Sequence, residues 1–192
     1  TMAVLDAAAG MEAAAKEPRN LLLAALCHDF GKPETTCADG QGHIRALRHE
    51  TAGVPLAKGF IKRLTSETEV RRYVANMVAL HMRPNVIAQG HPKLKTTNRL
   101  FDDSLCPEDL LLLCKADRMG QRKEAGYGPV EALLRSRLEA YRETMAKPGV
   151  TGKDLVELGF RPGPAFSEAL GFAHKLQLAG VEKEEALSQT KG

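Results

Sequence analysis

The chain has 192 residues, a net charge of +3 and 43% hydrophobic residues, so it is long enough and apolar enough for a full globular core. No apolar run reaches the roughly 18 residues that a membrane helix needs and no signal peptide is visible, so we expect neither a membrane protein nor a secreted one. The four cysteines show no CxxC spacing, which favours reduced thiols and a cytoplasmic location. The weak basic charge permits contact with nucleic acid without requiring it, and the oligomeric state is left open.

Nearly every segment predicts a helix, and no segment predicts a convincing sheet, so the expected fold class is all-α. A short extended piece is expected only at Ile44–Leu47. The predicted helices, in chain order, are Met2–Glu17, Leu21–Asp29, one beginning at His49, one ending at Pro84, Pro107–Gly120, Glu124–Lys147, a short one opening at Thr151 and Ala165–Ala179.

Several local signals set the ends of these helices. Gly31 and Pro33 are expected to end the helix that carries His28. Ser66 and Glu69 have the spacing of a capping box for the helix that follows them. Pro148-Gly149 is the best boundary, which predicts one domain over residues 1–147 and a short helical tail over residues 148–192.

His28 and Asp29 are adjacent polar residues at the end of an apolar helix. At 3.6 residues per turn, both continue lines of apolar side chains, so both are expected to face inward. A carboxylate in that position must be paired or bound to a metal, because an isolated buried charge is too costly. An imidazole beside a carboxylate suits a metal site, although the same pair could simply cap the end of the helix.

Three more polar side chains stand where the helical pattern calls for an apolar one: His49, His81 and Asp117. Asp117 ends a Leu-rich helix, and a buried acid there is rarely accidental. The alternative interpretation of Asp117 is that it forms a salt bridge to an arginine such as Arg118 or Arg122. His49 could instead be an exposed residue at the start of a helix, and His81 could be a satisfied core histidine.

Together these residues resemble the HD-domain superfamily of metal-dependent phosphohydrolases. The resemblance rests on His28-Asp29 followed by Gly31-Lys32, on His49-Glu50, on His81 and on the distant Asp117. It implies an HD-domain helical bundle in which His28, Asp29 and Asp117 bind one metal. It also implies that His49 and His81 hold a second metal, as two intervening histidines do in some members.

One expected ligand falls outside the sequence. The superfamily's first His commonly lies in a phrase His-Thr-Met-x-Val-Leu, and this chain begins Thr1-Met2-Ala3-Val4-Leu5. That ligand would be the residue before Thr1. The resemblance therefore predicts weak metal binding and weak or no activity for the chain without it.

The resemblance narrows to bacterial tRNA nucleotidyltransferases, the CCA-adding and poly(A) polymerase-like enzymes. The segments similar to them are Leu26–Pro33, Arg48-His49-Glu50, Thr151–Leu155, and Gly159 with Pro162-Gly163-Pro164 and Leu170. No Gly-Gly turn followed by Asp-x-Asp appears, so the nucleotide-adding site is not expected in this chain. If the parent protein adds nucleotides, that domain would lie upstream.

The implied chemistry is hydrolysis assisted by a divalent metal, which could be Mn, Fe, Ni, Co, Zn or Mg. Asp29 and Lys32 would be catalytic, and Lys32, Arg118 and Arg122 would contact the substrate, although all three cations could equally be solvated helix residues. The expected substrate is a phosphomonoester or cyclic phosphodiester of a nucleotide or an RNA end, and tRNA is a candidate partner. The alternative is a non-catalytic helical body that binds tRNA for an upstream nucleotidyltransferase domain.

Overall fold

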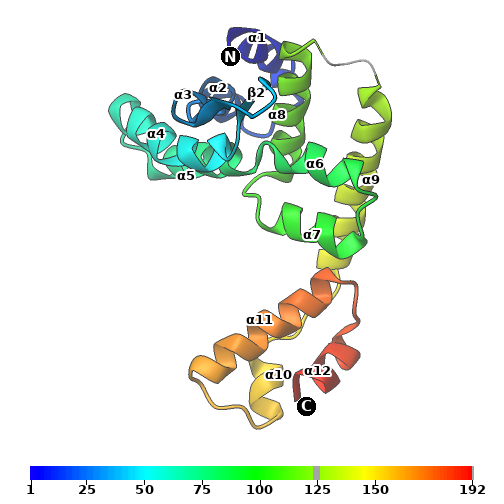
Figure 1. Ribbon diagram of the computed structural model, residues 1–192. Coiled ribbons are helices and arrows are strands. Elements are labelled where there is room, and N and C mark those ends of the chain that lie inside the picture. Colours follow the sequence, from blue (N-terminus) through cyan, green and yellow to red (C-terminus); the bar gives the residue numbers. More distant parts are fainter. Residues whose placement is uncertain (123–125, 192) are drawn as a thin grey trace. The chain divides into compact units, whose positions relative to one another are not determined.

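A computed structural model describes residues 1–122 and 126–191 (Figure 1). Their secondary structure is helical apart from one short hairpin, so the all-α prediction is confirmed. Glu124, the predicted start of one helix, lies outside the described residues. The chain divides into two compact units: residues 1–90 with 102–134 (unit 1), and residues 91–101 with 135–192 (unit 2). The division into residues 1–147 and 148–192 stays a prediction.

Unit 1 is a bundle in which α2 packs against α5 and α8, α1 packs against α2 and α8, and α4 lies along α5 (Figure 1). The largest apolar side chains of its core, among them Leu21, Ile61, Met77 and Leu110, are fully buried between these helices. Its elements are α1 (Met2–Ala9), η1 (Glu12–Ala14), α2 (Pro18–Cys27), α3 (Lys32–Thr35), β1 (Thr36–Ala38), β2 (Ile44–Ala46), α4 (His49–Leu64), α5 (Thr68–Leu80), α6 (Arg83–Gln89), α8 (Pro107–Gly120) and the first turns of α9 (Tyr127–Ala146).

Several predicted helix boundaries differ from the structure. The helix predicted over Met2–Glu17 ends at Ala9, and Pro84 does not end α5, which stops at Leu80, but lies in the first turn of α6. Pro33 lies in the first turn of the short helix α3, a position where its missing N–H costs nothing. The predicted capping box of Ser66 and Glu69 is wrong, because α5 begins only at Thr68 and has no side-chain cap. The hydroxyl of Thr65 instead accepts a hydrogen bond from the Glu67 N–H (3.2 Å) and organises the turn before α5.

A β-hairpin joins α3 to α4. β1 and β2 are antiparallel, with Cys37 opposite Arg45, and the expected extended piece is confirmed over Ile44–Ala46. Asp39 holds the tip, because its Oδ1 accepts hydrogen bonds from the N–H groups of Gln41 and His43, both at 2.9 Å. The hairpin is exposed, and it spans the chain between Asp29 and the start of α4.

Gly31 allows α3 to lie directly against the start of α4. A Cβ at this position would overlap the carbonyl of His49 and the backbone N–H of Gly53. Any larger residue would therefore push His49 away from the segment that carries Asp29.

Asp109 ties three helices together at the other end of unit 1. It is fully buried and accepts hydrogen bonds from the N–H groups of Lys16 (2.8 Å) and Glu17 (3.0 Å) and from the hydroxyl of Tyr73 (2.7 Å). The carboxylate thus joins the start of α2, the start of α8 and the middle of α5. His28 and Asp117 lie at the opposite, C-terminal ends of α2 and α8, so this anchor sets where those ends meet.

Unit 2 holds residues 94–101 of α7 (Leu94–Asp102), the rest of α9, α10 (Gly152–Glu157), α11 (Pro164–Leu178) and α12 (Lys183–Lys191). The side chain of Asn98 donates to the carbonyl of Leu178 (3.0 Å), and Thr151 and Asp154 form a capping box for α10. α11 packs against α10 and α12. Within the described residues, no helix is both long and apolar enough to cross a membrane.

Candidate metal centre

Five side chains named from the sequence converge in unit 1: His28, Asp29, His49, His81 and Asp117. Four helices bring them together. His28 and Asp29 follow α2, His49 is the first residue of α4, His81 follows α5, and Asp117 lies in the last turn of α8. All except Asp29 are buried, and Asp29 is largely covered.

The distances define a compact cluster. His28 Nε2 lies 3.1 Å from Asp29 Oδ2 and 3.5 Å from Asp117 Oδ1. His49 Nε2 lies 3.4 Å from Asp29 Oδ1 and 3.2 Å from His81 Nε2. One ligand atom from each of Asp29, His49 and His81 lies within 4.8 Å of the other two. The cluster therefore offers two carboxylates and three imidazoles to one small volume.

A nearby backbone carbonyl orients each of the three imidazoles. The Nδ1 atoms of His28, His49 and His81 face the carbonyl oxygen three residues earlier, at 2.7, 2.8 and 2.8 Å. These acceptors are the carbonyls of Ala25, Ala46 and Val78. A ring that donates from Nδ1 carries the free lone pair on Nε2 when it is neutral, which is how metal-binding histidines are usually held. All three Nε2 atoms then face the centre of the cluster.

The cluster fits a bound cation. His28 Nε2 is buried and makes no hydrogen bond of regular geometry, although buried polar atoms are normally satisfied. The Nε2 atoms of His49 and His81 approach to 3.2 Å, where two lone pairs would repel each other unless a proton or a metal lay between them. Imidazole nitrogen and carboxylate oxygen are common ligands of divalent transition metals.

The pKa values of the two most buried imidazoles, His28 and His81, shift in opposite directions. Burial opposes the charged form of His28, but the carboxylates of Asp117 and Asp29 outweigh burial and raise its pKa to about 9. Burial and the neighbouring charge of His28 lower the pKa of His81 to about 4. A proton therefore belongs on His28 when no metal is bound, while His81 stays neutral.

The two carboxylates stay ionised. Burial opposes this, but His28 and Lys32 hold the pKa of Asp29 far below its usual value. The pKa of Asp117 is also lowered against the effect of burial, by His28 and by Gln121. Lys32 contributes through an ion pair in which its Nζ lies 2.6 Å from Asp29 Oδ2.

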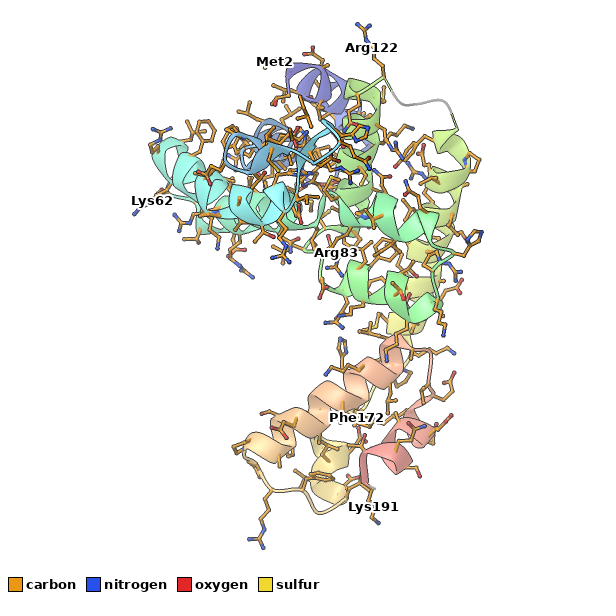
Figure 2. All side chains as sticks on the ribbon, in the orientation of Figure 1. Met2, Lys62, Arg83, Arg122, Phe172 and Lys191 are labelled. Atoms are coloured by element: carbon orange, nitrogen blue, oxygen red, sulfur yellow. The ribbon has the colours of Figure 1, made fainter. Side chains whose placement is uncertain are left out.

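The other predicted cations lie differently. The structure brings Lys32 to the edge of the cluster, whereas the Arg118 guanidinium lies over the Tyr127 ring, 5.9 Å from its centre. Arg122 is exposed, has a left-handed backbone (φ 55°) and extends outward past the end of α8 (Figure 2). In the described part of the chain, neither arginine forms an ion pair with Asp117, which was the alternative for that residue.

Sequence reasoning missed Gln121. Its side-chain N–H donates to Asp117 Oδ1 at 2.8 Å and so fixes the direction of that carboxylate. The two residues are four positions apart at the end of α8, and this spacing is the signal that could have revealed the pair.

The HD domain family model matches residues 1–120, which include all five clustered residues. The chain belongs to the HD domain family. The chain is also similar to curated proteins: it is 32% identical over 180 residues to a CC-adding tRNA nucleotidyltransferase of Thermus thermophilus, covering 88% of this chain and 39% of that protein. It is 33% identical over 126 residues to the Multifunctional CCA proteins of two Actinobacillus pleuropneumoniae strains, covering 63% of this chain and 30% of each.

These matches confirm the resemblance to the HD-domain superfamily and, more narrowly, to bacterial tRNA nucleotidyltransferases. The HD domain of this chain carries the expected His-Asp pair, and its curated relatives are a CC-adding tRNA nucleotidyltransferase and two Multifunctional CCA proteins. The chain spans less than half the length of these curated relatives.

Proposed function

We propose that this HD domain is a metal-dependent phosphohydrolase that acts on phosphomonoesters or cyclic phosphodiesters of a nucleotide or an RNA end. The observation that carries the proposal is the convergence of three buried Nε2 atoms and two ionised carboxylates on one volume. The family match supports the same reading, because it covers every residue of the cluster.

Each residue has a role in the proposal. His28, Asp29 and Asp117 would hold a divalent metal (Mn, Fe, Ni, Co, Zn or Mg), and His49 and His81 would complete the site or hold a second ion. A metal held there would polarise a phosphoryl oxygen and lower the pKa of a bound water.

The cations of the chain would handle the negative charge of the substrate. The Lys32 side chain is 42% exposed and lies at the edge of the cluster, so its ammonium can reach a phosphate oxygen from the solvent side. Arg118 and Arg122 follow Asp117 in the chain and would act further from the reacting phosphate. Arg122 is exposed and suits contact with a longer polyanion.

The proposal is tested on the chain with a histidine added before Thr1, because weak or no activity is expected without that ligand. The protein is stripped with a chelator and reloaded with one metal at a time. The substrates are p-nitrophenyl phosphate, bis(p-nitrophenyl) phosphate and a 2′,3′-cyclic nucleotide. We expect hydrolysis of at least one substrate, loss of activity in EDTA and recovery on adding metal. Metal binding without hydrolysis of any substrate would leave a metal site but contradict the hydrolase.

A histidine added before Thr1 tests the ligand that the superfamily places there. Val4 of α1 lies against Gly120, three residues beyond Asp117, so the start of the chain lies near the end of α8. We propose that the added histidine strengthens metal binding and raises turnover.

A second candidate function is a non-catalytic body that binds tRNA. The observation in its favour is that the similarity to the CC-adding tRNA nucleotidyltransferase covers 88% of the chain and so extends beyond residues 1–120. Anisotropy of a fluorescent tRNA would test it. Binding that survives EDTA, in a protein without hydrolytic activity, would favour this function over the hydrolase.

Replacing Gln121 with alanine should weaken metal binding by about 10- to 100-fold, because partners that orient a metal ligand typically contribute that much. The Asp117 carboxylate would lose the hydrogen bond that fixes its direction. Equilibrium dialysis against Mn²⁺ measures the change. Gln189→Ala is the matched control, since Gln189 makes the same i,i+4 contact with Glu185 in unit 2. Unchanged affinity in Gln121→Ala would mean that the contact only stabilises the end of α8.

A further inference from the structure

The Lys32 ammonium is paired with the Asp29 carboxylate, which would be a ligand of the proposed metal. We propose that Lys32 is a built-in counter-ion, which neutralises Asp29 in the metal-free protein, moves aside when a divalent metal binds and thereby keeps metal affinity low. This inference rests on the proposed metal site, and it assigns to Lys32 a role separate from contact with substrate.

The first observation is that two nitrogen atoms converge on one carboxylate oxygen. Lys32 Nζ lies 2.6 Å from Asp29 Oδ2, and His28 Nε2 lies 3.1 Å from the same atom. The Asp29 side chain is only 14% exposed, so water does little to offset its charge. Without a metal, Lys32 therefore supplies the charge compensation that this carboxylate needs.

The second observation is the direction of the two Asp29 oxygens. Oδ1 faces His49 at 3.4 Å, and Oδ2 faces His28. Both oxygens are thus turned toward imidazoles of the cluster, and neither is left for Lys32 alone. A divalent metal bound to Asp29 would lie within a few ångströms of the ammonium, and two like charges that close in a poorly solvated site repel strongly.

The third observation is that Lys32 is free to leave. Its side chain is 42% exposed, and Asp29 is its one ion-pair partner among the described residues. It sits at the start of a four-residue helix, so a change of rotamer would carry the ammonium into solvent without breaking any other pair. Once displaced, the ammonium stays tethered beside the site, where it can meet the phosphate of a substrate.

The competing interpretation is that Lys32 orients Asp29 as a ligand and so strengthens metal binding. The two interpretations predict opposite signs for the removal of the ammonium. As a counter-ion its loss tightens metal binding, and as an orienting partner its loss weakens it.

The test compares the intact chain with Lys32→Ala, Lys32→Gln and Lys32→Arg. Lys62→Ala is the control, because Lys62 is exposed and points away from the bundle near the end of α4 (Figure 2). Isothermal titration gives the Kd for Mn²⁺, and thermal unfolding with and without Mn²⁺ gives the stabilisation by metal. Neither measurement depends on turnover.

We expect Lys32→Ala and Lys32→Gln to bind Mn²⁺ at least tenfold more tightly than the intact chain. The Tm of the metal-free variants should fall, because Asp29 loses its counter-ion, while the Tm at saturating Mn²⁺ should change little. The rise in Tm on adding metal should therefore grow. Lys32→Arg and Lys62→Ala should bind as the intact chain does.

If the intact chain bound Mn²⁺ and Lys32→Ala bound it equally well or more weakly, the result would overturn the counter-ion role of Lys32. The proposed metal site would be unaffected. Absence of Mn²⁺ binding in all variants would overturn the metal site and the counter-ion together. If Lys32→Ala bound Mn²⁺ and the intact chain did not, the result would support the counter-ion role of Lys32, with the ammonium excluding the metal altogether.

Discussion

In the chain with a histidine added before Thr1, Asp29→Ala should lower metal-dependent hydrolysis by about 10³-fold or more, to the level of the uncatalysed reaction. Asp29 is the carboxylate that contacts His28, His49 and Lys32 at once. Its removal leaves imidazoles and an ammonium facing one another, with only Asp117 to offset their charge. Initial rates at saturating metal measure the effect, and metal content measured on the same sample shows whether the site is still loaded.

Two further variants make this experiment specific. Asp29→Asn keeps the volume of the side chain but removes its charge, and it should lose nearly as much activity. Asp103→Ala removes an exposed aspartate that pairs with Arg83, and it should keep the full rate, since exposed pairs contribute little to stability. An intact rate in Asp29→Ala under metal-replete conditions would show that this cluster is not the catalyst. The tRNA-binding body would then be the better interpretation.

Asp109→Ala should be the most destabilising single substitution in the bundle, at about 3–5 kcal/mol of unfolding free energy. The fully buried carboxylate accepts three hydrogen bonds, and its loss would leave two backbone N–H groups and the Tyr73 hydroxyl without an acceptor. Urea unfolding followed by circular dichroism measures the change. A loss below about 1 kcal/mol would show that water or a local shift satisfies the stranded donors.

Tyr73→Phe offers a graded comparison, because it removes one of the three donors and keeps the carboxylate. It should cost about 1–2 kcal/mol, less than Asp109→Ala. Asp6→Ala, an exposed substitution on α1, should change stability by less than about 0.5 kcal/mol. Neither Asp109 nor Tyr73 touches the metal cluster, so the folded fraction of each variant should bind metal as the intact chain does.

The helical period was enough to predict the fold class and to select the clustered residues. His28, His81 and Asp117 each continue an apolar line near the end of a helix, and this conflict between a polar residue and an inward position is visible from neighbours within two turns. Their convergence is not visible in that way. It depends on helices that are far apart in the chain and on the contact of Gly31 with α4.

The residues that the sequence did not reveal act over long separations or through the backbone. Asp109 looks like an ordinary acid in the first turn of a helix, and its partners Lys16 and Glu17 precede it by more than 90 residues. The ring orientation of His49 depends on the carbonyl of Ala46, which becomes an acceptor only because β2 turns into α4 there. No local pattern of side chains carries that information.

The hairpin between α3 and α4 also provides a site for chemical labelling. Cys27, Cys106 and Cys114 are buried, and burial raises the pKa of each thiol to about 12. Cys37 in β1 is the exposed thiol of the four. A maleimide dye at neutral pH would therefore attach at one position, on the segment that connects Asp29 to His49, without any cysteine having to be removed first. The fluorescence of that dye could follow metal loading in real time in the unmutated chain.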